Sequence, residues 1–176
     1  MTKIYVFDIE TTGLSPYKDK ILEIGIASLD TQSNYVEGEV FWTINEEVTG
    51  NEWVFKNSSL TIEDIKNSNY SIQEVIGLFT DFIRGKILTA YNKIFDFGFM
   101  NSNGFNPSCI SDYPDIMLLA KPILNIRHPT LRIKRPSVQE CLNHFHINKL
   151  ESHRALDDAI LEAKILLKIL ILKGEI

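Results

Sequence analysis

The pattern of apolar and polar positions changes character near residue 53 of the chain. Before that point, three runs rich in β-branched and aromatic residues, at 3–8, 21–29 and 35–44, predict strands joined by polar turns. After it, apolar residues at helical spacing predict helices at 61–66, 71–83, 95–101, 138–144 and 155–172. Short apolar runs at 86–91 and 108–111 predict two more strands. This order predicts an α/β fold with a mixed five-stranded sheet and helices packed on it.

Two of the predicted helices carry start signals. Ser71 and Glu74 have the spacing of a capping box, in which each residue bonds the backbone amide of the other. The apolar residues behind them follow helical spacing at Ile72, Val75, Ile76, Phe79 and Phe82. Thr61 stands where the cap of the preceding short helix is expected.

Length and composition fit one soluble domain over residues 1–176. Of these residues 44% are hydrophobic, which is enough for a sizeable core. The N-terminus lacks the features of a secretory signal, and the most apolar stretch, 165–172, is too short to span a bilayer. We therefore expect a cytoplasmic protein with no membrane partner. Cys109 and Cys141 form no CxxC pair, which predicts free thiols in the core.

The net charge of −5 argues against a protein that coats nucleic acid through charge alone. One stretch, 121–135, nevertheless contains basic residues and no Asp or Glu. It is either a loop that contacts a nucleic-acid backbone or a merely solvated loop. Its members are Lys121, Arg127, His128, Arg132, Lys134 and Arg135.

A pair of carboxylates marks the end of the first predicted strand. Asp8 and Glu10 are two residues apart, so both point to the same face of an extended strand while Ile9 points into the core. Two adjacent carboxylates at the end of a buried strand repel one another and are costly to desolvate. Oxygen ligands of this kind suit a hard cation such as Mg²⁺ or Mn²⁺. Taken alone, the pair also fits a solvated strand end.

A third acid, Asp96, follows the predicted strand at 86–91 inside a nearly all-apolar run. A charge in such a run needs a partner. In the last predicted helix, a rotation of about 100° per residue separates two neighbouring acids. Asp158 falls beside the apolar stripe, where a site could form, and Asp157 falls on the polar face. Glu162, one turn further on, is a weaker candidate for the same site.

His153 precedes Asp158 by five residues, which would put the two on different faces of a regular helix. We therefore expect His153 on the loop before the first turn. From there the imidazole could reach a water molecule near bound cations.

Three stretches together resemble the DEDDh family of 3′–5′ exonucleases, which includes the proofreading subunit of bacterial replicative DNA polymerase III. They are F-D-I-E-T-T-G at 7–13, N-K-I-F-D-F-G-F-M at 92–100 and H-R-A-L-D-D-A at 153–159, and I-L-E-I-G-I-A at 21–27 is similar to the family's second strand. The resemblance spans essentially the whole chain and implies a ribonuclease H-like fold. Any one motif is weak, but all three in order are a strong signal. Tyr91 departs from the family, because many members have histidine there, and this puts fine substrate positioning in doubt.

By this resemblance, two divalent cations, Mg²⁺ or Mn²⁺, would be held by Asp8, Glu10, Asp96 and Asp158. Asp8 would bridge both ions, Glu10 and Asp158 would hold the ion on the nucleophile side, and Asp96 would hold the ion on the leaving-group side. His153 would be the general base. Two such ions can clamp the attacking and leaving oxygens of a phosphodiester displacement.

The resemblance also implies the substrate contacts and the 3′ polarity. Thr11 and Thr12 would meet the terminal 3′-hydroxyl, Leu14 would pack on the last base, and Asn92 would support the loop of the second motif. Ordinary turn and packing roles are equally open for these four residues. The products would be nucleoside 5′-monophosphates.

Three functions are consistent with these features. The first is an exonuclease acting on the 3′ end of single-stranded or frayed DNA, with a polymerase or another replication or repair protein as a possible partner. The second is an exoribonuclease on the same scaffold, since contacts to the 2′-hydroxyl cannot be located in sequence. The third is a non-catalytic binding module, which the presence of all four acids and the histidine disfavours.

Overall fold

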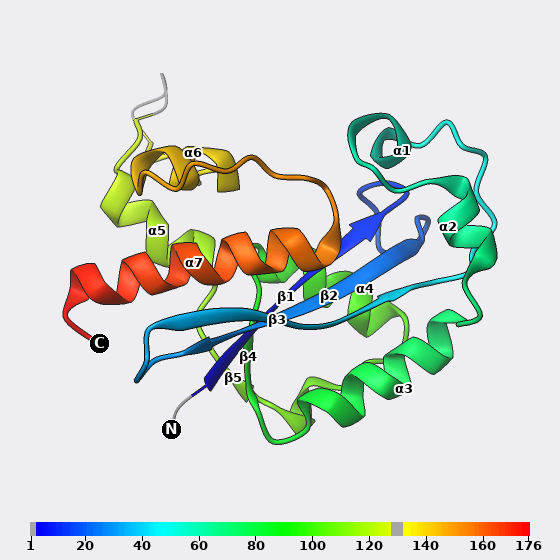
Figure 1. Ribbon diagram of the computed structural model, residues 1–176, viewed down its shortest axis with the longest axis horizontal. Helices are drawn as coiled ribbons and strands as arrows, with labels where there is room; N and C mark the ends of the chain where they lie inside the picture. Colours follow the sequence, from blue (N-terminus) through cyan, green and yellow to red (C-terminus); the bar gives the residue numbers. More distant parts are fainter. Residues whose placement is uncertain (1–2, 128–131) are drawn as a thin grey trace.

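A five-stranded mixed sheet forms the centre of the computed structural model, which describes residues 3–127 and 132–176 (Figure 1). The strand order is β3-β2-β1-β4-β5. The first three strands pair antiparallel, whereas β4 and β5 run parallel to β1. The strands are β1 (Lys3–Thr11), β2 (Ile21–Asp30), β3 (Tyr35–Thr43), β4 (Ile87–Thr89) and β5 (Ser111–Asp112).

Helices cover both faces of the sheet (Figure 1). One face packs against α3 and α4, and the other against α5, α6 and α7, while α1 and α2 lie beyond one end of the strands. The helices are α1 (Trp53–Asn57), α2 (Ile62–Asn67), α3 (Ile72–Ile83), α4 (Lys93–Ser102), α5 (Ile116–Leu124), α6 (Val138–His144) and α7 (Ala155–Lys173), with a 3₁₀ turn at Pro107–Cys109. The capping box of Ser71 and Glu74 is confirmed, and Thr61 caps α2 together with Asp64.

Successive side chains of β1 point to opposite faces of the sheet. Ile4 and Val6 belong to the core under α7, whereas Phe7 and Ile9 belong to the core on the side of α3 and α4. Asp8 continues the series of Ile4 and Val6, because alternate residues share a face. The carboxylates of the first motif therefore extend from the sheet face that α7 covers.

A glycine in β2 lets α7 approach the sheet closely. Gly25 is paired with Asp8 across the two strands. A Cβ atom at position 25 would lie 2.2 Å from the backbone nitrogen of Leu156, a distance that no side chain can occupy. The first turn of α7 therefore rests on the backbone of β2, directly beside Asp8.

Two helices were not predicted from the sequence. The helix α5 begins at a recognisable cap, since the Asp115 carboxylate accepts a hydrogen bond from the amide of Leu118 at 2.9 Å. Its internal Pro122 and the basic residues after it favoured a loop instead. Of the basic stretch predicted as a loop at 121–135, Lys121 therefore lies in a helix. His128 lies outside the described residues. The short α1 has no side-chain cap, so its start carries little signal.

The bounds of β1, β4 and β5 differ from the prediction by more than one residue, and β4 is Ile87–Thr89 rather than 86–91. β1 continues beyond Asp8 to Thr11, because Thr11 still pairs with Ile21 after a register shift. The last strand is Ser111–Asp112 rather than 108–111, because Pro107 starts a 3₁₀ turn that occupies the preceding residues.

Cys109 and Cys141 are free thiols, as predicted, but only Cys141 of the two is buried in the core, and Cys109 is half-buried. Among the described residues, none of the helices combines the length and the apolar character that crossing a membrane requires.

Candidate active site

The carboxylates of β1 lie in an environment poor in compensating charge. Glu10 is 8% exposed, and Asp8 is half-buried. Burial, followed by the charge of Asp158, raises the pKa of Glu10 to about 8. Burial also raises the pKa of Asp8 well above its ordinary value, and the charge of Glu162 is the next largest cause. The two groups therefore lie within a larger cluster of acids.

The start of α7 contributes the next acid to this cluster. Asp158 is 5% exposed and accepts a hydrogen bond from the backbone amide of Ser152 at 3.0 Å. Its neighbour Asp157 is exposed and accepts a bond from the Ser152 hydroxyl instead. The predicted separation of the two acids is confirmed. Burial is the main cause that raises the pKa of Asp158.

His153 stands on the loop before α7, as predicted, with a left-handed backbone (φ 52°). Its Nδ1 lies 4.0 Å from Oδ2 of Asp158. Ligand atoms of Glu10, His153 and Asp158 all lie within 4.8 Å of one another. The ring of Trp53 packs edge-on against the imidazole, with 4.7 Å between the ring centroids. The imidazole is therefore held between an aromatic wall and the acids.

Asp96 occupies the first turn of α4, which follows β4 at the edge of the sheet. The parallel pairing of β1 and β4 places the carboxyl ends of both strands at this edge. Asp96 is 3% exposed, and burial raises its pKa to about 8 even though backbone amides at the start of α4 lower it. Its charge also acts on Asp8, so Asp96 belongs to the same cluster.

These donors fit divalent cations. Ligand atoms of Glu10, Asp158 and the His153 imidazole converge, whereas Asp8 and Asp96 lie outside that group and are linked to it through their charges. Hard cations such as Mg²⁺ and Mn²⁺ prefer oxygen ligands of this kind. A further buried carboxylate, that of Glu162, leaves its Oε2 without a hydrogen-bond partner among the described residues. Bound cations would offset the desolvation and the mutual repulsion that raise the pKa values of these acids.

An ion pair that sequence analysis missed fastens the loop of His153 to the sheet. Arg154 donates from Nε and Nη2 to the two carboxylate oxygens of Glu23, at 3.0 and 2.7 Å. Glu23 is 1% exposed and lies opposite Glu10 in the strand pairing. The available signal was an acid inside the apolar run of β2, because such a charge requires a partner.

Replacing Arg154 with Met should destabilise the protein by about 3–5 kcal/mol, because it leaves the buried carboxylate of Glu23 without its counter-charge. Urea denaturation followed by circular dichroism measures this loss. The double variant Glu23→Met/Arg154→Met should recover most of the stability, since it removes both charges. Equal stability of Arg154→Met and wild type would mean that the ion pair does not hold this loop.

A pocket of 520 Å³ opens beside the acids. Leu14 is 84% exposed and Trp53 is 58% exposed, so apolar surface is available at its mouth. The hydroxyl of Thr11 donates to the carbonyl of Gly13, and that of Thr12 accepts from the amide of Lys20, so both serve the turn. The lining residues are Ile9, Glu10, Thr11, Thr12, Gly13, Leu14, Trp53 and Phe95. Trp53 and Phe95 were not identified from the sequence, because nothing local marks them.

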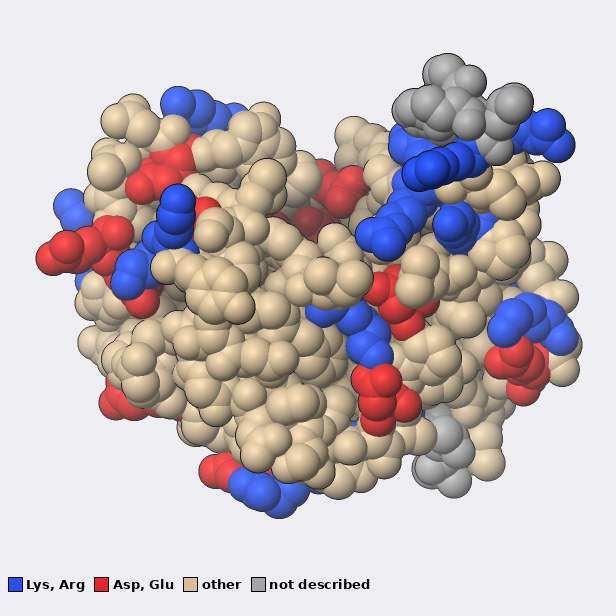
Figure 2. Space-filling view, turned by 180° about the vertical axis from the view of Figure 1, so that it is seen from behind, with Lys and Arg blue, Asp and Glu red and all other residues tan. Residues whose placement is uncertain are grey.

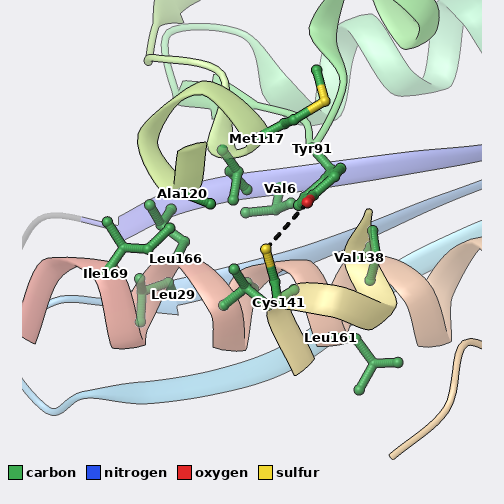
Figure 3. Close-up of a cluster of buried hydrophobic side chains, with 14 of the residues drawn as sticks. Val6, Leu29, Tyr91, Met117, Ala120, Val138, Cys141, Leu161, Leu166 and Ile169 are labelled. Carbon is green, nitrogen blue, oxygen red and sulfur yellow. Dashed lines mark hydrogen bonds between the residues drawn. The ribbon is translucent and has the colours of Figure 1, made fainter. Parts of the chain in front are cut away.

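Tyr91 and Asn92 precede α4. The hydroxyl of Tyr91 donates to the carbonyl of Pro136 at 2.8 Å and lies 3.2 Å from Sγ of Cys141, inside the core under α7 (Figure 3). Its side chain therefore ties the second-motif loop to α6. The backbone carbonyl of Asn92 accepts from the amides of Phe95 and Asp96, as at the start of any helix, and its side chain makes no capping bond, so its role in the loop stays a prediction.

Figure 2 shows acidic side chains inside a recess and a group of Lys and Arg side chains near one of its edges, by the end of α5. The exposed basic residues of that region are Arg127, Arg132, Lys134 and Arg135. Lys134 is paired with Glu140, whereas the three arginines form no salt bridge within the described part of the chain. A polyanion approaching the recess would therefore meet positive charge on one side.

The strand order, the parallel β1–β4 pair and the acids at the ends of these strands define a ribonuclease H-like nuclease domain. The RNase T family model, described as an exonuclease, matches residues 5–166. The chain therefore belongs to this exonuclease family. Dependence on a divalent metal ion follows from the family and agrees with the acid cluster.

Two bacterial proteins described as DNA polymerase III PolC-type are similar over most of the chain. The protein of Caldanaerobacter subterraneus subsp. tengcongensis is 30% identical over 173 residues, and that of Clostridium perfringens is 32% identical over 167 residues. The matches cover 94% and 92% of this chain but 11% of each relative. The chain thus corresponds to a small part of these polymerases.

Solved structures of Escherichia coli exonuclease I share the fold. The complex with a dA16 oligonucleotide superposes with a TM-score of 0.69 at 14% identity, covering 98% of this chain and 41% of that one. Another exonuclease I structure gives a TM-score of 0.71 at 16% identity, with the same coverage of 98% and 41%. The likeness confirms the predicted fold class.

Proposed function

We propose that residues 1–176 form a single exonuclease domain that removes nucleotides from the 3′ end of single-stranded or frayed DNA by two-metal-ion hydrolysis. The observation that carries the proposal is the convergence of Glu10, His153 and Asp158 within 4.8 Å, beside Asp8 and Asp96 in the same cluster. The charges of Asp96 on α4 and of Asp158 on α7 both act on Asp8 of β1, which supports the proposal.

In this proposal, Asp8, Glu10, Asp96 and Asp158 hold two Mg²⁺ or Mn²⁺ ions. When bound, such ions stabilise the charge on the attacking and leaving oxygens of a phosphodiester displacement. His153 takes a proton from the attacking water. The new bond forms between that oxygen and phosphorus, and the bond from phosphorus to the 3′-oxygen of the preceding nucleotide breaks. The product is a nucleoside 5′-monophosphate, and the shortened strand regains a 3′-hydroxyl.

The pocket beside Glu10 fits the terminal nucleotide. Leu14 and Trp53 offer apolar surface to its base, while Thr11 and Thr12 lie at the turn where the terminal 3′-hydroxyl would sit. The exposed arginines at the end of α5 would meet the backbone of the incoming strand.

DNA is favoured over RNA by two comparisons. The relatives are described as DNA polymerase III PolC-type, and exonuclease I has been seen with DNA oligonucleotides. The same relatives make a polymerase or another replication or repair protein the proposed partner. An exoribonuclease on this scaffold is the second candidate.

Matched 5′-labelled DNA and RNA single strands test the proposal. With Mg²⁺ or Mn²⁺, we expect the DNA to shorten stepwise from its 3′ end, the RNA to shorten more slowly, and EDTA to stop both reactions. Faster RNA degradation would favour the exoribonuclease. A protein inert on both strands with either metal would instead be a binding module.

A further inference from the structure

Glu162 lies on α7 one turn after Asp158. Four residues advance a helix by about 6 Å and return nearly to the same face, so Glu162 faces the acid cluster one turn deeper in the protein. Only 3% of its surface is exposed. The motif residues do not include it, and the mechanism proposed above assigns it no role.

The carboxylate of Glu162 is incompletely bonded. It accepts a hydrogen bond from the backbone N–H of Tyr91, the residue at the start of the second-motif loop. Its Oε2 is buried and has no partner within the described ranges 3–127 and 132–176. A buried carboxylate oxygen without a partner is costly, and native structures complete such groups with a water molecule, a ligand or an ion.

The charges around Glu162 are negative. Those that act on it most strongly belong to Asp96, Asp158 and Glu151, and together with burial they raise its pKa well above the ordinary value. In turn, the charge of Glu162 has a larger effect on Asp8 than that of any other carboxylate. Glu162 therefore lies on the side of the cluster where Asp8 and Asp96 stand.

We propose that Glu162 is a fifth carboxylate of the metal centre and that its free Oε2 holds the cation on the Asp8–Asp96 side, directly or through a water molecule. The inference rests on the two-metal function proposed above. The opposite side already has Glu10, His153 and Asp158 within 4.8 Å of one another. Without Glu162, the other cation would depend on Asp8 and Asp96 alone.

A fifth carboxylate changes the affinity for metal. More negative charge on the ligands strengthens the binding of a divalent cation, and one more oxygen completes more of its coordination. Because Glu162 and Asp158 stand on one rigid helix, the two sides of the centre are tied to consecutive turns of α7. With Glu162 included, each side of the centre has three protein side chains, so we expect the two cations to bind with similar affinity.

Calorimetric titration of Mn²⁺ into the metal-free protein tests this inference without any substrate. Wild type should bind two ions. In Glu162→Gln, one of the two sites should weaken about 10- to 100-fold, the range seen when a group supporting a metal site is removed. Asp157→Asn is the matched control, because it removes an exposed carboxylate from the same helix and should bind Mn²⁺ like wild type.

The outcomes separate this inference from the proposed function. Two unchanged sites in Glu162→Gln would overturn the role of Glu162 and leave the two-metal centre intact. Wild type that binds no Mn²⁺ would overturn the metal centre itself. Melting temperatures of the metal-free variants control for folding, and Glu162→Met provides the same comparison if the Gln variant does not fold. Equal weakening of both sites with a lower melting temperature would identify Glu162 as a folding residue and contradict the inference.

Discussion

Replacing Asp158 with Asn should lower the rate of 3′-nucleotide release by about 10³-fold or more, since a catalytic metal contributes several kcal/mol and each 1.36 kcal/mol is worth tenfold. The amide keeps the size of the side chain and its bond to the Ser152 amide, but it removes a negative charge from the cation site. Single-turnover digestion of a 5′-labelled DNA strand at saturating Mg²⁺ measures the effect. The metal-free fold should survive, because one of several repelling acids has been removed.

The neighbouring acid supplies the control for this prediction. Asp157 is exposed and faces away from the cluster, so Asp157→Asn should retain wild-type turnover. Full activity in Asp158→Asn together with its loss in Asp157→Asn would contradict both the placement of α7 and the proposed ligand set.

Replacing His153 with Ala should reduce turnover by about 10²- to 10⁴-fold, the range typical of a lost general base. The imidazole lies at the side of the cluster formed by Glu10 and Asp158, where a proton of the attacking water must be removed. The loss should fall on kcat with little change in KM, because the proton transfer occurs in the transition state. Steady-state kinetics on a short DNA strand separates the two constants.

His144 provides the matched control for that variant. It is exposed at the end of α6, away from the described acids, so His144→Ala should behave as wild type. An increase in KM with an unchanged kcat in His153→Ala would mean that the imidazole binds substrate and does not transfer a proton.

Regular patterns made most of the fold predictable. The antiparallel opening of the sheet follows from three β-rich runs with polar turns, and α3 follows from its capping box. The helix α5 was missed because Pro122 interrupts a pattern that its cap at Asp115 had begun. The extension of β1 to Thr11 was missed because cross-strand pairing, and not local propensity, determines where a strand ends.

Site residues were predictable where a charged residue stands within an apolar stretch of the sequence. Asp96 and Asp158 stood out for this reason, and both are buried. Trp53 and Arg154 were missed, because an exposed aromatic ring and a surface arginine are ordinary until the fold brings them to His153 and Glu23. Neither the pocket beside Glu10 nor the unpartnered oxygen of Glu162 can be derived from local sequence, since both depend on elements far apart in the chain.

The contact at Gly25 fixes the distance between β2 and the first turn of α7. Because main chain touches main chain there, the spacing between the acids of β1 and those of α7 is set by van der Waals contact of two backbones rather than by the fit of flexible side chains. Core residues elsewhere can then be exchanged for others of similar volume with little effect on the distance between the acids. A single methyl group at position 25 would push the first turn of α7 away from β2 and would thereby displace the acids of the helix from those of β1.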